Sequence, residues 1–206
     1  MLVATLVTYN DMPLIKDCIK SIYNKVDRII AIDGKYLDFP GISNVSTDGT
    51  IQYLSELKKV ELMITTDLDE VAKRNLYLSF LNEGDICLNI DTDEVLTGSI
   101  PELKTDIGII MIGEQGDRRR HRRSIRFFKY RHGLHYWGKH TLVLDKDDNL
   151  FAHLDKYGKN YTAEKIESFE LLHNNHLRTR NRVIDKGKYY KILMAREAKV
   201  ETTKLS

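Results

Sequence analysis

The chain is poor in cysteine, proline and long apolar runs. Its 206 residues include only two cysteines, Cys18 and Cys87, and three prolines. Both cysteines lie in apolar patterns, and neither has partners at the spacing of a zinc site, so we interpret them as buried core thiols. This low cysteine content argues against a disulfide-rich secreted protein and fits a reducing cytoplasm.

No apolar stretch approaches the roughly 20 residues that a membrane-spanning helix needs. Residues 2–7 form an apolar run that is typical of a strand, and no basic segment precedes it, so no signal peptide is expected. We therefore expect a cytoplasmic protein whose contact with a membrane, where it has one, is peripheral.

Positive and negative charges nearly cancel, with 32 Lys and Arg against 30 Asp and Glu, so the overall field selects no partner. The charges are unevenly spread, however, because residues 118–123 hold five arginines and residues 178–188 are also basic. A hydrophobic content of 42% is ordinary for a globular protein. We expect one domain spanning residues 1–206, with one sizeable core.

The first half of the chain alternates short apolar runs with segments of helical periodicity. Strands are expected at residues 2–7, 28–32, 61–64, 86–90 and, further on, 107–112. Helices are expected to begin at Pro13 and at the capping residues 46–50, and to cover residues 69–82. This alternation predicts an α/β fold with a mostly parallel central sheet and helices on both faces.

Polar side chains follow four of these strands directly. They are Tyr9, Asn10 and Asp11, then Asp33, then Thr65 and Asp67, and finally Asp91 and Asp93. Ligands of parallel α/β sheets bind beyond the carboxyl ends of the strands. The four strand ends therefore predict one common binding cleft.

The expected strand at residues 86–90 runs directly into Asp91, Asp93 and Glu94. Carboxylates this close together raise at least one pKa unless a metal ion, Arg or Lys lies between them. Hard oxygen ligands favour Mg²⁺ or Mn²⁺, which keep waters and share their coordination shell with substrate phosphates. The alternative is a solvated acidic turn at the end of a strand.

In the expected helix at residues 69–82, Arg74 shares one side with Val71, Leu78 and Leu81. An arginine on the side that faces a sheet is costly unless an anion receives it. The acidic cluster and a phosphate bound beside it are both candidates. The alternative is a side chain whose head reaches past the sheet into water.

The second half has a different pattern. Residues 123–129 and 141–144 alternate like antiparallel strands, and residues 178–198 have the pattern of a basic helix. We interpret the arginine-rich residues 118–123 as a mobile, solvated loop. Alternatively, this run covers a diphosphate or contacts a phosphorylated lipid or an anionic membrane face. The second half therefore adds a small antiparallel region that completes the cleft.

Six short motifs together resemble the family 2-like glycosyltransferases of the GT-A fold. They are residues 6–10, Asp33-Gly34, residues 46–50, residues 73–75, Gly84-Asp85 and residues 91–94, in the order and rough spacing of that family. The resemblance covers about the first 100 residues. It implies a GT-A-type fold in which residues 1–98 are the nucleotide-sugar-binding half and residues 99–206 the acceptor-side half.

The resemblance implies a metal-dependent transferase with a nucleotide-diphospho-sugar donor and a glycan, lipid or protein acceptor. The expected donor-binding residues are Thr8, Tyr9 and Asp33 for base and ribose, Arg74 for the diphosphate, and Asp91 for ribose or metal-bound water. Asp93 would ligate Mn²⁺ or Mg²⁺, which neutralises the leaving nucleoside diphosphate. Members of the family invert the anomeric centre and use one carboxylate as the base.

The second half resembles the family more loosely. Residues 124–128 and 137–140 are similar to a family segment that usually ends in His-Glu, but Thr141 stands where the glutamate is expected. Glu114 and Asp117 are therefore our candidates for the base, and Glu114 is preferred because it lies closer to the end of the fifth strand. His173 is similar to the histidine that can complete the metal shell in the family, and His176 is its rival.

Two other functions compete with this interpretation. A nucleotidyltransferase acting on a sugar phosphate usually has a glycine-rich loop after the first strand, and residues 8–11 contain no glycine. A nucleic-acid-binding module would use the two basic segments but would leave the acidic cluster unexplained. We therefore expect no nucleic-acid partner.

Overall fold

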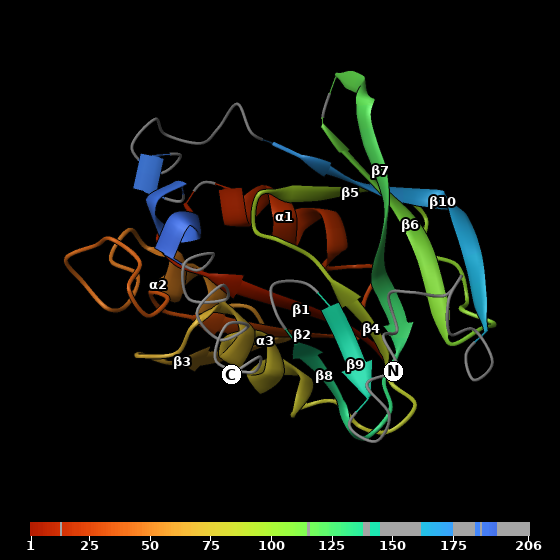
Figure 1. Ribbon diagram of the computed structural model, residues 1–206, viewed down its shortest axis with the longest axis horizontal. Helices are drawn as coiled ribbons and strands as arrows, with labels where there is room; N and C mark the ends of the chain where they lie inside the picture. Colours follow the sequence, from red (N-terminus) through yellow and green to blue (C-terminus); the bar gives the residue numbers. More distant parts are fainter. Residues whose placement is uncertain are drawn as a thin grey trace, which may run out of the picture.

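The computed structural model describes residues 1–12, 14–114, 116–137, 141–144, 162–174, 184–185 and 187–192. Figure 1 shows a curved sheet with helices packed against it. The elements in chain order are β1 Leu2–Thr8, α1 Leu14–Ile22, β2 Arg28–Asp33, α2 Thr50–Ser55, β3 Val60–Ile64, α3 Glu70–Leu78, β4 Ile86–Asn89, β5 Glu94–Gly98, β6 Ile107–Glu114, β7 Asp117–Lys129, β8 Leu134–Trp137, β9 Thr141–Leu144 and β10 Ala163–His173. Residues 184–185 and 187–192 are helical.

The main sheet has eight strands in the order β3-β2-β1-β4-β7-β6-β10-β5. β7 runs antiparallel to β4 and β6, and β5 runs antiparallel to β10, while the remaining strands share one direction. The sheet is therefore mostly parallel, as predicted. Strands β8 and β9 form a separate antiparallel pair, which confirms a small antiparallel region in the second half.

Helices cover both faces of the parallel strands, because neighbouring residues of β1 point to opposite sides. Ala4 and Leu6 belong to one apolar cluster together with Ile15 and Ile19 of α1. Val3 belongs to a second cluster that contains Tyr77 and Leu78 of α3. Figure 1 shows α1 and α3 on opposite sides of β1 and β4. The expectation of helices on both faces is confirmed.

The expected elements of the first half are all present, with small shifts at their ends. α3 begins at its N-cap Asp69, whose carboxylate accepts a hydrogen bond from the backbone of Ala72 at 2.8 Å. Within the predicted capping residues 46–50, Gly49 is the N-cap of α2 and makes no side-chain cap hydrogen bond, while the Asp48 carboxylate accepts a hydrogen bond from the backbone N–H of Thr50 at 3.1 Å. Ser46 instead donates to Asp33.

The sheet differs from the prediction in two places. Glu94 was expected in the carboxylate cluster that follows β4, but it begins β5, a strand that was not predicted, and it is fully buried. The arginine-rich run was expected to be a loop, yet it lies in β7, where Asp117, Arg122 and Arg123 pair with β6. A strand can carry consecutive arginines because a partner strand supplies its backbone hydrogen bonds. The loop prediction is therefore wrong.

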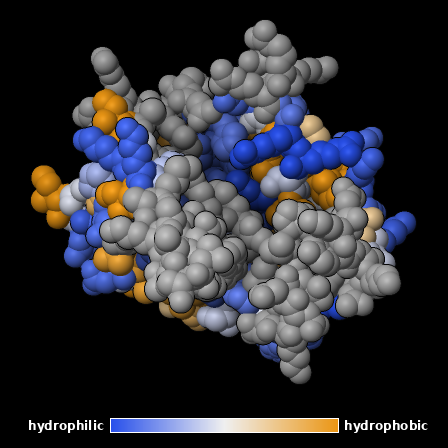
Figure 2. Space-filling model, viewed as in Figure 1, coloured by the Kyte–Doolittle hydropathy of each residue, from blue (hydrophilic) through white to orange (hydrophobic). Residues whose placement is uncertain are grey.

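The turn end of the β6–β7 hairpin projects away from the rest of the main sheet, as Figure 1 shows. Hydrophilic residues gather where Figure 1 places the middle of β7, as Figure 2 shows. Within the described part of the chain, no helix is long and apolar enough to cross a membrane.

Candidate functional site

The direction of the chain connections reverses between β1 and β4, since β2 and β3 lie on one side of β1 and β4 lies on the other. Such a switch point opens a crevice at the carboxyl ends of the two strands. Asp11, just after β1, joins the two sides of this crevice. Its Oδ2 accepts hydrogen bonds from Thr8 Oγ1 at 3.1 Å and from Thr92 Oγ1 at 2.9 Å. Of the four strand ends predicted to converge, those of β1 and β4 meet here.

Asp33 lies at the end of β2, opposite Thr8 in the β1–β2 register. Its carboxylate is fully buried and accepts hydrogen bonds from the backbone N–H of Ser46, at 3.0 Å, and from the Ser46 hydroxyl. Burial raises the pKa of Asp33, and the hydrogen bonds from Ser46 oppose that rise. Asp33 therefore holds the segment before α2 against the sheet edge.

Lys73 of α3 ties the ends of β2 and β3 together. Its ammonium donates to the carbonyl oxygens of Gly34, at 2.6 Å, and Thr65, at 3.3 Å, and the side chain is fully buried. Burial lowers the pKa of Lys73 to about 8. Gly34 has φ of +129°, and a Cβ there would meet the Thr65 carbonyl oxygen at 2.0 Å, so only glycine fits this junction.

Tyr9 packs in an aromatic cluster with Phe39 and Tyr189, and its hydroxyl donates to the Ser43 carbonyl oxygen at 2.7 Å. Tyr189, in the helical residues 187–192, stacks on Tyr36 with ring centroids 5.3 Å apart. The second half of the chain therefore reaches the loops that follow β1 and β2.

Residues 91–94, which we call the acidic tip of β4, form a tight turn. Asp91 N donates to Glu94 Oε2 at 2.7 Å, and Glu94 N donates to the Asp91 carbonyl oxygen at 2.9 Å. The chain therefore reverses directly from β4 into β5, with Glu94 buried beneath the turn. Burial raises the pKa of Glu94, and the charge of Arg126 opposes this rise.

Arg74 faces the sheet from α3, as its place in the helical pattern predicted, and the acidic cluster receives it. Its Nη2 lies 3.2 Å from Asp91 Oδ1 and 3.2 Å from Glu70 Oε1. Its Nη1 donates to Asn89 Oδ1 at 2.9 Å. Burial disfavours the charge on Arg74, but the surrounding groups outweigh it and its pKa is raised. The head of this arginine does not escape past the sheet edge.

Arg126 of β7 is a second arginine at the tip, and the sequence analysis did not find it. Its Nη2 donates to Asp91 Oδ2 at 3.0 Å and its Nη1 to Glu94 Oε2 at 3.1 Å. The register between β6 and β7 passes from Gly108↔Phe127 to Ile109↔Ile125, so Arg126 is an extra residue in a β-bulge. Burial disfavours its charge, but Asp91 and Glu94 outweigh that effect and raise the pKa of Arg126.

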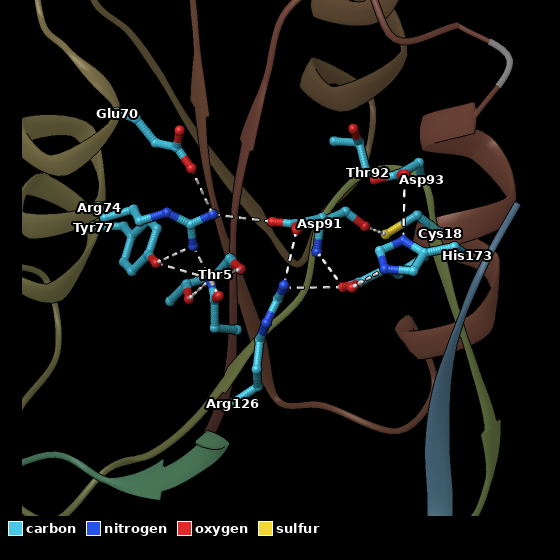
Figure 3. A network of polar contacts seen from close by, with 12 residues as sticks. Thr5, Cys18, Glu70, Arg74, Tyr77, Asp91, Thr92, Asp93, Arg126 and His173 are labelled. Atoms are coloured by element: carbon cyan, nitrogen blue, oxygen red, sulfur yellow. Dashed lines mark hydrogen bonds and ion pairs between the residues drawn. The ribbon is translucent and has the colours of Figure 1, made fainter. Parts of the chain in front are cut away.

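These groups form a line of alternating charge that we call the charge row: Glu70, Arg74, Asp91, Arg126 and Glu94. Figure 3 shows Glu70, Arg74, Asp91 and Arg126 in sequence across the site. The cation that the acidic tip was expected to need is supplied, in this structure, by two arginines.

His173, the last residue of β10, extends this arrangement. Its Nδ1 lies 3.3 Å from Asp93 Oδ2 and its Nε2 lies 3.5 Å from Glu94 Oε1. In the sheet register His173 is opposite Glu94 on one side and opposite Glu114 on the other. Glu114 is therefore the cross-strand neighbour of His173.

Asp93 and His173 are the two predicted metal ligands that lie close together. Among the described residues, no group of three His, Cys, Asp or Glu side chains is arranged to hold a metal ion. Mg²⁺, however, commonly binds one or two carboxylates and completes its shell with water and substrate phosphates. Asp93 supplies one carboxylate for a site of that kind, and His173 lies beside it.

Some predicted residues lie outside what the structure describes. Asp117 begins β7 and pairs with Glu114, but its side chain is outside the described part, as is His176. Asp11 and Arg126 were assigned no role from sequence. The position of Asp11 directly after a strand was a usable signal, whereas nothing in the alternation of β7 marked Arg126.

A scan against protein-family models finds no match, and a search of curated proteins finds none either. Among solved structures, the chain is similar to residues 1–349 of S. aureus TarS, at 19% identity and a TM-score of 0.44, over 57% of this chain and 37% of that one. A second TarS structure matches at 20% identity and 0.41, over 57% of this chain and 23% of that one. The 1–349 segment in complex with UDP-GlcNAc matches at 20% identity and 0.40, over 57% and 36%. The chain thus spans under two thirds of the TarS chains, and at these TM-scores the likeness carries no argument about activity.

Proposed function

We propose that this protein is a glycosyltransferase that moves a sugar from a nucleotide-diphospho-sugar donor to an acceptor hydroxyl, with inversion. The observation that carries the proposal is the charge row at the carboxyl edge of a mostly parallel sheet, beside the switch point between β1 and β4. A crevice at this place, lined by arginines and carboxylates together, suits a ligand that is both anionic and rich in hydroxyl groups.

The donor would lie along this edge. Thr8 and Tyr9, at the end of β1, would hold the base and ribose, and the buried Asp33, at the end of the adjacent strand β2, would act through the Ser46 segment that it fixes. Arg74 would contact the diphosphate, and Asp91 the ribose or a metal-bound water. The hydrogen bonds of Asp33 and Lys73 would keep the loops after β2 and β3 in place while the donor binds.

The reaction would exchange one bond for another at the anomeric carbon. The acceptor oxygen attacks this carbon while the bond to the diphosphate oxygen breaks, and the nucleoside diphosphate leaves with the electron pair. Glu114 would take the acceptor proton, with Asp117 as the rival, and the cross-strand position of Glu114 beside His173 supports the first choice.

We further propose that Asp93 and His173 hold Mn²⁺ or Mg²⁺. When bound, such an ion would supply Lewis-acid neutralisation of the diphosphate. Asp93 Oδ2 and His173 Nδ1 lie 3.3 Å apart, which supports these two side chains as ligands of the same ion.

A thermal-shift screen against nucleoside diphosphates and their sugar conjugates, each with Mn²⁺ and with EDTA, tests the function. UDP-GlcNAc and a guanosine diphosphate sugar should both be included. A ligand at a hundred times its dissociation constant stabilises the native state by about 2.7 kcal/mol, and the compound that does so should be hydrolysed or transferred. Turnover of a nucleoside triphosphate with a sugar phosphate, or the absence of any shift, would contradict the proposal.

A further inference from the structure

The two arginines of the charge row contact the same carboxylate, that of Asp91. Asp91 Oδ1 contacts Arg74 Nη2 at 3.2 Å, and Asp91 Oδ2 contacts Arg126 Nη2 at 3.0 Å. The side chain of Asp91 is 30% exposed, whereas those of Arg74 and Arg126 are 4% and 10% exposed. Asp91 is therefore the member of the row that an incoming ligand meets first.

Each arginine also has a buried carboxylate of its own behind it. Arg74 pairs with Glu70, and Arg126 pairs with Glu94, which is fully buried. Neither pairing involves Asp91. If the Asp91 carboxylate turns away, both guanidinium groups stay anchored, and both point toward the place that Asp91 occupies in Figure 3.

The protein does not use all the donors of Arg74. Its Nε is buried and has no hydrogen-bond acceptor among the described residues. A guanidinium carries five N–H donors in a rigid fork that matches phosphate oxygens. Arg74 thus has one N–H donor that no described group uses.

The bulge in β7 fixes where Arg126 points. The pairing of β4 with β7 ends at Leu88↔Phe127, so Arg126 is the next residue of β7 beyond that pairing. The extra residue of a bulge bends the strand and re-aims the side chain. Arg126 therefore comes from a strand of the second half but reaches the tip of β4 in the first.

We propose that Arg126 joins Arg74 in binding the diphosphate of the donor, and that the Asp91 carboxylate holds the place between them that a phosphate oxygen takes. The inference deepens the proposed function and rests on it for the identity of the ligand. Glu70 and Glu94 hold the two guanidinium groups in place, so both are preorganised to bind a pyrophosphate through paired N–H donors. Asp91 is then both a positioning group and a competitor of the ligand.

The test is isothermal titration calorimetry of the full chain with inorganic pyrophosphate in EDTA at low salt. The wild type should bind, and Arg126→Gln should bind about tenfold or more weakly, because it loses charge-assisted hydrogen bonds. Arg126→Lys should fall between them, since lysine keeps the charge but not the fork. The matched control is Arg131→Gln, which removes an arginine that pairs with Asp106 just after the C-terminal end of β7 and should leave pyrophosphate binding unchanged.

Asp91→Asn separates this role from a structural one. Removing the competing carboxylate should tighten metal-free pyrophosphate binding, whereas a merely structural Asp91 would leave it unchanged or weaken it. If Arg126→Gln fails to fold, the double variant Arg126→Gln/Glu94→Gln leaves no charge of that pair unpaired in the core and should also bind pyrophosphate weakly.

Three results would overturn the inference: no pyrophosphate binding by the wild type, wild-type affinity in a folded Arg126 variant, or unchanged or weaker binding by Asp91→Asn. None of these measurements requires a sugar, a metal or turnover. A protein that binds pyrophosphate through Arg126 but transfers no sugar would keep this inference and lose the proposed function.

Discussion

Asp33 and Asp91 lie at the same edge of one sheet, yet their surroundings differ. Asp33 ends β2, is fully buried, and receives hydrogen bonds from the uncharged Ser46. Asp91 follows β4, is partly exposed, and lies between two arginines. The same residue type at equivalent strand ends thus has two different environments.

The difference shows which part of the edge is scaffold and which part is reactive. Around Asp33, neutral donors and the buried Lys73 join loops to one another. Around Asp91, every neighbour in the charge row carries a charge, so a small displacement there changes the balance of several strong interactions. We expect substitutions at the tip of β4 to affect turnover, and substitutions at the end of β2 to affect stability.

The largest expected effect is that of Asp93→Ala at the tip of β4. Loss of the proposed metal ligand should reduce Mn²⁺-dependent hydrolysis or transfer of the sugar nucleotide by at least about a thousandfold, while the variant stays folded. Steady-state kinetics and circular dichroism measure the two quantities. Asp93→Asn is the isosteric control, and unchanged turnover in the alanine variant would refute the metal assignment.

A second large effect is expected from Glu114→Gln, in the strand beside His173. Loss of the general base should lower kcat by about 10²–10⁴-fold and leave donor affinity intact, because the carboxylate acts on the acceptor. Single-turnover kinetics measure the loss in the rate of the chemical step, and titration with the donor measures its affinity. If Asp117→Asn produces this loss and Glu114→Gln does not, the base is Asp117.

The smallest effect, and the one that tests the scaffold side, is Asp33→Asn. It should lower the free energy of unfolding by about 1–3 kcal/mol, because one donor of Ser46 loses its acceptor. The pKa of Asp33 is raised in the fold, so the native state binds this proton more tightly than the unfolded state does. Wild-type stability should therefore fall relative to the variant as pH rises above the ordinary aspartate pKa.

Urea unfolding of both proteins at several pH values measures this difference. An advantage of the wild type that grows as pH rises would contradict the assignment. If Asp33→Asn instead abolished donor binding without any loss of stability, the division between scaffold and reactive tip would be wrong.

Much of the first half could be predicted because its signals are local. The apolar runs of β1 to β4 and the helical spacing around Arg74 require no knowledge of distant partners. Arg74 was placed on the sheet-facing side of α3 in this way, and an anionic partner was expected from the cost of burying it.

Arg126 could not be found by the same reasoning. Its direction depends on a one-residue change of register between β6 and β7, and strand alternation within β7 contains no information about register. The arginine-rich part of β7 was misread for a related reason, since its backbone partners lie in β6. β5 was missed because the turn between Asp91 and Glu94 reverses the chain within residues that looked like a polar loop.

By itself, the sequence determined that a buried strand would deliver clustered carboxylates to the edge of a parallel sheet and that something positive must accompany them. Only the tertiary structure decided which groups those are: an arginine from α3 and another from a bulge in β7, with His173 from β10 beside them. The reason is physical, because the spacing of side chains along one element follows from local geometry, whereas the meeting of charges from four separate elements follows only from how their strands pair.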